Sequence, residues 1–400
     1  MSYPTITDVT IKNYKSIGQC HVELGKITVL IGQNGSGKSN FLDALQLLSD
    51  ALNSTLEYAI RQRGGISEVR RRSGGHPTHF VIRLRLKLTD TLHAGFAFRA
   101  GSTAEERGFT VQQEALVIRE GKEIVASYES KEGNIVKKSE NLTLIPATSS
   151  DRLFLTAVSA LPEFRPVFDA LSKMHFYNIN PADIRAPQPH ASGEVLSHTG
   201  GNLPSVLRRL SSDDPDAFAR IEEYARRIVS GIDGIEYRAL GPTETIEFRQ
   251  RVQNIRHPWR FYAAAMSDGT LRSVGILTAL FQTDPRGNPP TLIGIEEPES
   301  TIHPGAAAIL TDALIEGSAR HQVLVTTHSP DLLDHPGLQL TDIRVVDNVN
   351  GETRIETADV ATRTMLKDEL FTAGELLRKN QIRARKTKSD EIRTPDLFRL

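Results

Sequence analysis

The sequence is poor in residues that build covalent or metal-based frameworks. A single cysteine, Cys20, occurs among 400 residues, so the chain forms no internal disulfide and suits a reducing compartment. Twelve histidines are present without any C-x-x-C pair, which removes the usual zinc signature. Cys20 lies in a short strand-like segment, where we expect a small buried residue and not a reactive thiol.

Long apolar runs and an excess of charge are also missing. No stretch approaches the ~20 apolar residues that cross a bilayer, and the first residues show no basic-plus-apolar leader. Lys and Arg total 48 against 49 Asp and Glu, a net charge of -1. This balance argues against a globally basic nucleic-acid binder but allows a local basic patch. We therefore expect a soluble, cytoplasmic protein with one large core or two smaller ones.

The strongest pattern present is a glycine-rich turn between an apolar run, residues 27–31, and an amphipathic segment, residues 38–56. It matches G-x-x-x-x-G-K-[ST], in which backbone N–H groups close around phosphate oxygens at a helix N-terminus. Lys38 is expected to reach the β- and γ-phosphates of ATP, and Ser39 to ligate Mg²⁺. The residues expected to bind nucleotide here are Gly32, Asn34, Gly35, Ser36, Gly37, Lys38, Ser39 and Asn40.

The residues before this turn make the pattern more specific. A strand-like segment ends in "IKNYKSI", a second covers residues 21–24, and "ITVLIGQNGSGKSNFLDAL" follows. This order resembles the head of the RecF/SMC/OLD-type ATPases, a branch of the ABC ATPases. The resemblance implies that the basic residue after the first strand, here Lys15, lies near the nucleotide phosphates. A solvated turn lysine is the alternative.

A basic run bounded by glycine pairs, Gly64–Gly75, follows the first helical segment. The glycines mark a loop, and its arginines suit either phosphate contact or a solvated face, two readings that stay open. The resemblance also implies a glutamine near this point that couples nucleotide to a partner; Gln62 is a weak candidate.

The spacing of apolar residues changes twice in the middle of the chain. Residues 80–88 alternate apolar and polar side chains, and strand-like pieces at 95–99, 109–112, 116–119 and 124–128 continue an antiparallel meander. From residue 152 to residue 231 the period becomes helical, with helices expected at 162–173, 202–210 and 215–230. No sustained heptads occur, so a long coiled-coil arm is not expected. Strands resume between residues 235 and 264.

Three further motifs follow in the order that the resembled family uses. The segment "MSDGTLR" resembles the ABC signature in its RecF/OLD form. The resemblance implies that Ser267 and Gly269 contact the γ-phosphate bound to the other subunit. Read alone, the serine is an ordinary helix N-cap.

The apolar run Leu292–Ile295 ends in two acids, Glu296 and Glu297. Such a strand places carboxylates at the ligand-binding edge of a parallel sheet. Glu296 takes the Walker B place that holds Mg²⁺, and Glu297 is the candidate that activates water. The sequence leaves open which of the two glutamates has which role. The loop 299–303 lies at the dimer contact in the resembled family.

Another apolar run ends in "TTHSP", which resembles the family's histidine switch. His328 is then the residue that senses the γ-phosphate. A polar, basic tail closes the sequence. The resembled OLD-type nucleases carry a Toprim domain after this point. Such a domain is longer than the stretch that follows His328 in this sequence, so we expect any such nuclease to be a separate protein.

These observations predict an α/β fold, an ABC-type ATPase head (P-loop NTPase, mixed sheet with flanking helices) with an antiparallel β-lobe and an inserted helical lobe. The expected segments are 1–150, 151–234, 235–370 and a tail, 371–400. The function expected from the resemblance is a dimeric ATPase that regulates a bacterial anti-phage system with a separate Toprim-like effector. A RecF-like DNA repair clamp is the alternative. The expected ligands are ATP and Mg²⁺.

Overall fold

The computed structural model describes residues 3–72, 77–103, 108–140, 142, 148–252, 257–368 and 370–385. The chain divides into two compact units. Unit 1 comprises Met1–Met174, Leu340–Lys367 and Ile382–Leu400, and unit 2 comprises His175–Gln339 and Asp368–Gln381. The segment expected as one helical lobe, 151–234, is thereby shared between the units. Part of the arginine loop (73–76) and of the tail (386–400) lies outside the described residues.

Unit 1 is built on a mixed sheet with the strand order β8-β7-β6-β5-β4-β1-β2-β17-β16-β3. Most neighbours are antiparallel, whereas β16 runs parallel to β3 and β17 runs parallel to β2. The strands of unit 1 are β1 (Thr5–Tyr14), β2 (Ile17–Glu23), β3 (Ile27–Ile31), β4 (His79–Lys87), β5 (Leu92–Ser102), β6 (Phe109–Glu120), β7 (Glu123–Lys131), β8 (Asn134–Lys138), β16 (Ile343–Val349) and β17 (Glu352–Glu356).

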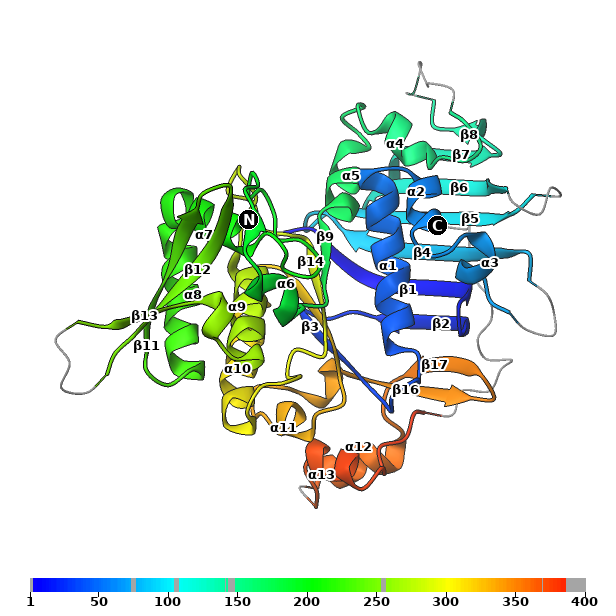
Figure 1. Ribbon diagram of the computed structural model, residues 1–400. Helices are drawn as coiled ribbons and strands as arrows, with labels where there is room; N and C mark the ends of the chain where they lie inside the picture. The colour runs from blue at the N-terminus through cyan, green and yellow to red at the C-terminus, as the bar shows by residue number, and fades with distance from the viewer. Residues whose placement is uncertain are drawn as a thin grey trace. The chain divides into compact units, whose positions relative to one another are not determined.

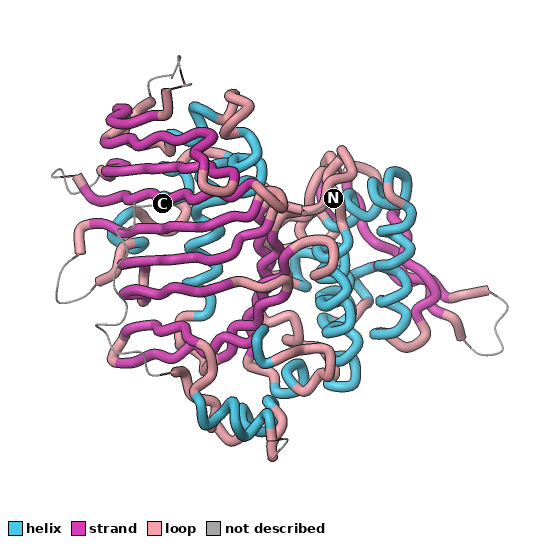
Figure 2. Tube along the Cα trace, turned by 180° about the vertical axis from the view of Figure 1, so that it is seen from behind, coloured by secondary structure: helices cyan, strands magenta, loops and turns pink. Residues whose placement is uncertain are grey.

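Helices cover one face of this sheet. Helix α1 lies across the strands in Figure 1, and in Figure 2, seen from behind, the strands stand in front of it. The large apolar residues of the segment that the sequence predicts as amphipathic are all buried in α1: Phe41, Leu42, Leu45, Leu48 and Leu52. The helices of unit 1 are α1 (Lys38–Asn53), α2 (Leu56–Arg61), α3 (Ile66–Val69), α4 (Phe154–Val158), α5 (Arg165–Ser172), α12 (Val360–Lys367) and the 3₁₀ turn η2 (Leu340–Asp342).

The expected β-meander is present, with one difference. The pieces expected at 109–112 and 116–119 are one continuous strand, β6. The sequence suggests a break because polar residues, including Glu114, interrupt the alternation there. The structure keeps Glu114 fully buried and satisfies it through hydrogen bonds from Tyr128 and from the N–H groups of Phe154 and Leu155. A buried polar group tolerated in this way is a tertiary effect that periodicity does not detect.

Glu114 makes the stability of the protein depend on pH. Burial raises the pKa of this carboxyl to about 7, against the lowering effect of the three hydrogen bonds. Below about pH 4.5 both states hold the proton, and between about pH 4.5 and 7 only the folded chain keeps it. Stability should therefore fall by up to about 3 kcal/mol as pH rises through this window, the loss being complete above it. Thermal unfolding of the wild type and of Glu114→Gln, measured from acid to neutral pH, checks this. The variant cannot ionise, so an unchanged pH slope in it would contradict the assignment.

Unit 2 combines the parallel pair β14–β15, beside which β9 lies, with a second, antiparallel sheet. Strands β15, β14 and β9 are neighbours in that order, and β12 lies between β11 and β10, with β13 also paired to it. The strands are β9 (Met174–Tyr177), β10 (Gln188–Pro189), β11 (Ile232–Leu240), β12 (Thr243–Gln250), β13 (Trp259–Tyr262), β14 (Leu292–Glu296) and β15 (Gln322–Thr327). The helices are α6 (Pro181–Arg185), α7 (Leu203–Asp213), α8 (Pro215–Ile228), η1 (Ala263–Ala265), α9 (Asp268–Phe281), α10 (Pro304–Gly317), α11 (Pro330–Leu333) and α13 (Ala373–Arg378).

Helix lengths agree with the absence of heptads in the sequence. Among the described residues the longest helix is α1, with 16 residues. None of the helices that the structure describes combines the length and apolarity that crossing a bilayer requires. The mixed sheet with flanking helices agrees with the expected α/β class.

Candidate functional site

The phosphate loop connects a buried strand to the N-terminus of a long helix. All five residues of β3 are buried, which anchors the loop at its start. Helix α1 begins at Lys38 and has no acidic residue in its first turn. No carboxylate of that turn therefore competes for the helix's first N–H groups, the arrangement that binds phosphate.

Two glycines of the loop are required for different reasons. A Cβ at Gly32 would lie 2.1 Å from the carbonyl oxygen of Val346. Gly37 has φ 102°, and its Cβ would lie 2.0 Å from Thr353 Oγ1. A larger residue at either position would push the loop away from the β16–β17 hairpin, and at Gly37 it would also strain the backbone.

The phosphate loop and the start of α1 offer polar groups of the kind that bind a triphosphate. Lys38 is buried, and its Nζ donates to the carbonyl oxygens of Gly32 (2.8 Å) and Gln33 (3.1 Å). Ser36 Oγ is buried and has no hydrogen-bond partner among the described residues. Ser39, next to Lys38, is exposed. These groups fit a nucleotide triphosphate.

The remaining loop residues divide into two kinds. Asn34 and Gly35 are exposed at the tip of the loop, and Gly35 has φ 77° with open space around it. Asn40 instead points to the β1–β2 turn, where its Nδ2 donates to Ser16 Oγ over 2.6 Å. Asn40 therefore connects the helix to that turn.

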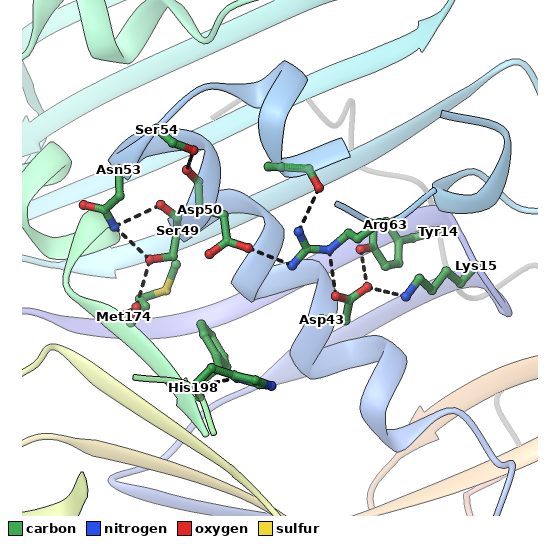
Figure 3. Close-up of polar contacts among 12 residues, drawn as sticks. Tyr14, Lys15, Asp43, Ser49, Asp50, Asn53, Ser54, Arg63, Met174 and His198 are labelled. Atoms are coloured by element: carbon green, nitrogen blue, oxygen red, sulfur yellow. Dashed lines mark hydrogen bonds and ion pairs between the residues drawn. The ribbon is translucent and has the colours of Figure 1, made fainter. Parts of the chain in front are cut away.

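Lys15 forms an ion pair with Asp43 on α1, as Figure 3 shows; its Nζ lies 2.5 Å from Asp43 Oδ2. Tyr14 Oη and Arg63 Nε, each at 2.7 Å, complete the shell of this carboxylate. Burial raises the pKa of Asp43, but Arg63 and Lys15 outweigh it and hold this pKa below its usual value. Lys15 is thus a partly exposed cation paired with a helix residue, Asp43, that lies within the first two turns of α1.

In unit 2 two parallel strands carry the acidic and histidine motifs to one edge. Glu296 pairs with Thr326 in the β14–β15 register, so the next residues of both strands meet. His328 Nδ1 lies 3.3 Å from Glu297 Oε1. The structure thus brings together two residues that lie 31 positions apart in the sequence, at the strand ends where ligands bind.

Glu297 is held in a strained turn. Its φ is 42°, a left-handed conformation that is uncommon for a glutamate. Its N–H donates to Thr326 O at 2.9 Å, and Ser300 Oγ donates to its Oε2 at 3.3 Å. Strain of this kind persists where surrounding contacts determine the backbone, and such positions cluster at functional sites.

Arg272 of α9 holds the backbone of the same turn in place. The sequence motifs did not identify this residue. Its Nη2 donates to the carbonyl oxygens of Glu296 and Glu297, both at 3.0 Å. Burial lowers the pKa of Arg272, while Glu297, Glu299 and Glu296 oppose this shift. A guanidinium keeps its charge under such conditions, so a buried cation from the signature helix supports the acidic turn.

Glu299 has a structural partner that the sequence did not indicate. Its Oε1 accepts from Thr327 Oγ1 (2.5 Å) and from the N–H of His328 (3.3 Å). Its Oε2 is buried and has no partner among the described residues. The Glu299 carboxylate therefore shapes the end of β15, from which His328 projects.

The signature segment begins helix α9 as expected. Ser267 is the N-cap, accepting from the N–H of Thr270 at 3.3 Å, and it is exposed. A Cβ at Gly269 would lie 2.5 Å from Thr301 O, so this glycine lets the helix start touch the loop after the acidic turn. Asp268 is exposed and pairs with Arg185. The capping reading is therefore correct, and the exposed serine is accessible as well.

The residues expected to hold Mg²⁺ are few. Within the described ranges no group of three or more His, Cys, Asp or Glu side chains could hold a metal ion. Mg²⁺ typically takes one or two protein oxygens and completes its shell with waters and substrate phosphates. The Ser39 hydroxyl is an oxygen donor of this kind in unit 1, and the Glu296 carboxylate is one in unit 2, so the chemistry of each residue suits Mg²⁺.

A known protein family matches the part of the chain that contains these motifs. A family model described as "AAA domain, putative AbiEii toxin, Type IV TA system" matches residues 27–334. The match begins at β3 and extends beyond His328, so it includes the phosphate loop, the acidic strand and the histidine. The chain belongs to this family. It is a P-loop ATPase, as the sequence predicted. No curated protein matches the chain.

Solved SMC heads share the fold of the ATPase. The structure "Crystal structure of the SmcHead bound to the C-winged helix domain of ScpA" has a TM-score of 0.57 and 14% identity, covering 90% of this chain and 99% of that chain. An Smc head with an extended coiled coil, bound to the C-terminal domain of ScpA and derived from Pyrococcus furiosus, has a TM-score of 0.52 and 12% identity, covering 92% and 99%. The expected ABC-type head fold is thus confirmed.

Proposed function

We propose that the ATPase works as a nucleotide-switched dimer in which each subunit covers the γ-phosphate bound to the other. The observation that carries this proposal is the set of contacts that helix α9 makes with the acidic turn and the loop after it. Its exposed start, Ser267, is followed by Gly269 against the Thr301 loop and by Arg272 against the acidic turn. A phosphate contact at the helix start would therefore act directly on Glu297, which gives the dimer a route to control hydrolysis.

Hydrolysis needs a positioned water and stabilised phosphate charge. Glu297 is proposed to orient the water and accept its proton, while His328 contacts the γ-phosphate from the adjacent strand end. Lys38 stabilises charge that develops on the transferred phosphoryl group. Ser39 and one of the two adjacent glutamates are the residues that would hold Mg²⁺, and the ion would supply further charge neutralisation. Glu296 is proposed for that role because the Glu297 carboxylate already contacts His328 and Ser300.

The biological role is proposed from the family. Its description names a toxin of a type IV toxin–antitoxin system, and the similar SMC heads are bound to parts of a partner protein, ScpA. The family description supports a role in such a system, and the ScpA-bound heads support action through a separate partner protein. We propose that the ATPase regulates a bacterial anti-phage system through a separate Toprim-like nuclease or other effector. ATPase activity measured with and without duplex DNA tests the alternative: strong stimulation by DNA alone would favour a RecF-like clamp and contradict the effector model.

Ser267→Arg should bind ATP but fail to hydrolyse it, because a large cation replaces the small serine at the shared site. Mixing this variant with Lys38→Ala should restore activity, since a mixed dimer contains one site with two intact halves. Turnover of each variant alone and of the mixture, with light scattering for dimerisation, measures this. Up to about a quarter of wild-type turnover is expected at equal mixing, since about half of the dimers are mixed and each has one good site.

Two control variants distinguish a loss of phosphate contact from a loss of helix capping. Ser267→Asp preserves an N-cap yet brings a negative charge towards the phosphate, so it should also lose turnover. Ser211→Arg makes the same serine-to-arginine change at another exposed serine of unit 2 and should leave turnover unchanged. Normal hydrolysis by Ser267→Arg alone, or a mixture that dimerises without recovering activity, would contradict the shared site.

A further inference from the structure

A chain of polar groups connects the phosphate loop to a strand more than 300 residues away in the sequence. Asn40 Nδ2 donates to Ser16 Oγ at 2.6 Å, and Ser16 Oγ lies 2.7 Å from Thr353 Oγ1. Thr353 Oγ1 donates to the carbonyl oxygen of Ser36 at 2.8 Å. Since a threonine hydroxyl has one proton and Ser36 takes it, Ser16 must donate to Thr353. The four groups therefore form a one-directional chain that begins and ends on the phosphate-loop segment.

Thr353 is well fixed at its end of the chain. It is completely buried in β17, and its N–H donates to Ser16 O at 2.9 Å. The hydroxyl also lies only 2.0 Å from the position that a Cβ at Gly37 would take, so it packs directly against the loop. Three hydrogen bonds and tight packing hold its position, and a single buried hydroxyl satisfies the Ser36 carbonyl.

Thr353 holds the Ser36–Gly37 peptide unit, which contributes the Gly37 N–H to the phosphate loop. In a planar trans peptide the C=O of one residue and the N–H of the next point in opposite directions. Fixing the Ser36 carbonyl towards β17 thereby aims the Gly37 N–H away from β17. Lys38 fixes the carbonyls of Gly32 and Gln33 in the same manner, and so orients the N–H groups that follow them.

The same chain fixes the turn that carries Lys15. Ser16 is the neighbour of Lys15, and Arg71 Nη1 donates to Ser16 O at 2.6 Å. The β1–β2 turn is therefore tied to α1 twice, through Ser16 to Asn40 and through Lys15 to Asp43. Loop and turn form one polar unit with Thr353 at its buried end.

From this geometry we infer that Thr353 is a positioning residue of the phosphate site, acting through the Ser36–Gly37 peptide and the Ser16 hydroxyl. Its hydroxyl aims the loop's N–H groups at the phosphates of the nucleotide without touching the ligand. The inference rests on nucleotide binding at the phosphate loop and not on the dimer.

Three variants at two positions test it. Thr353→Val keeps the shape of the side chain and removes the hydroxyl, and should raise the Kd for ADP roughly tenfold. Thr353→Ser keeps the hydroxyl and should bind ADP as the wild type does. Ser16→Ala breaks the chain at its middle and should weaken binding to a smaller extent, so it serves if Thr353→Val fails to fold. ADP is the probe because it lacks the γ-phosphate that the proposed dimer requires.

Thr311→Val is the matched control. Thr311 is also fully buried and its hydroxyl donates to a backbone carbonyl, Ala307 O, at 2.9 Å, in helix α10 of unit 2. This variant should change thermal stability at most and leave ADP affinity unchanged. Wild-type affinity in Thr353→Val, an equal loss in Thr353→Ser, or the same loss in Thr311→Val would each overturn the inference.

Discussion

Lys38→Ala is expected to reduce ATP turnover by roughly 100-fold or more, the cost of removing a donor aimed at developing charge. The side chain is buried and its ammonium already lies at the carbonyls of Gly32 and Gln33. It is therefore held inside the loop that surrounds the phosphates, and alanine leaves no cation there. Nucleotide affinity should also fall. Steady-state ATPase assays and equilibrium binding of ATP measure the two effects separately.

The control for Lys38→Ala is Lys26→Ala, which removes an exposed lysine from the same unit, just before β3. It should hydrolyse ATP normally. Because Lys38 also bonds two loop carbonyls, thermal unfolding of the variant must accompany the assay. A folded Lys38→Ala protein with normal turnover would refute the phosphate-loop assignment.

Glu297→Gln is expected to bind ATP and to lose turnover by roughly 100- to 10,000-fold, the range for a missing general base. The amide preserves the size of the side chain and can keep one of the contacts with Ser300 and His328, but it cannot accept a proton. ATP should therefore accumulate in the bound state, and the proposed dimer should persist with ATP. Single-turnover kinetics and light scattering in ATP measure these effects.

Glu296→Gln is the discriminating companion. If Glu296 is the Mg²⁺ ligand, this variant should need more Mg²⁺ to reach its maximal rate, whereas Glu297→Gln should not respond to added Mg²⁺. The opposite pattern, with hydrolysis retained in Glu297→Gln and lost in Glu296→Gln, would show that the two roles are reversed.

The local motifs could be predicted because their physics is local. A buried strand, a glycine turn and an amphipathic helix follow one another within about thirty residues, and each has its own pattern. Both loop glycines, the helix start at Lys38 and the N-cap at Ser267 are where the sequence places them. The two parallel strands that end in acids and histidine were equally visible, because each is a short apolar run that stops at a polar residue.

Elements stabilised mainly by distant partners were missed or misjudged. Strand β17 is short and mostly polar, with only Thr353 and Ile355 buried, so no apolar alternation reveals it. Strand β6 looks interrupted because the sequence does not show that Tyr128 and the start of α4 satisfy Glu114. Both cases depend on hydrogen bonds between residues far apart in the chain.

The sequence by itself determined that this protein has a phosphate loop, an acidic strand end and a histidine strand end in the order of an ABC-type ATPase, because each motif is a continuous stretch. Only the tertiary structure decided what holds these motifs in shape. Arg272 on the acidic turn, Glu299 at the end of β15 and Thr353 behind the phosphate loop act across 24, 28 and 317 positions of sequence. A single polar side chain at such a separation leaves no periodic trace, and its role follows only from the folded chain placing a donor at an otherwise unpaired acceptor.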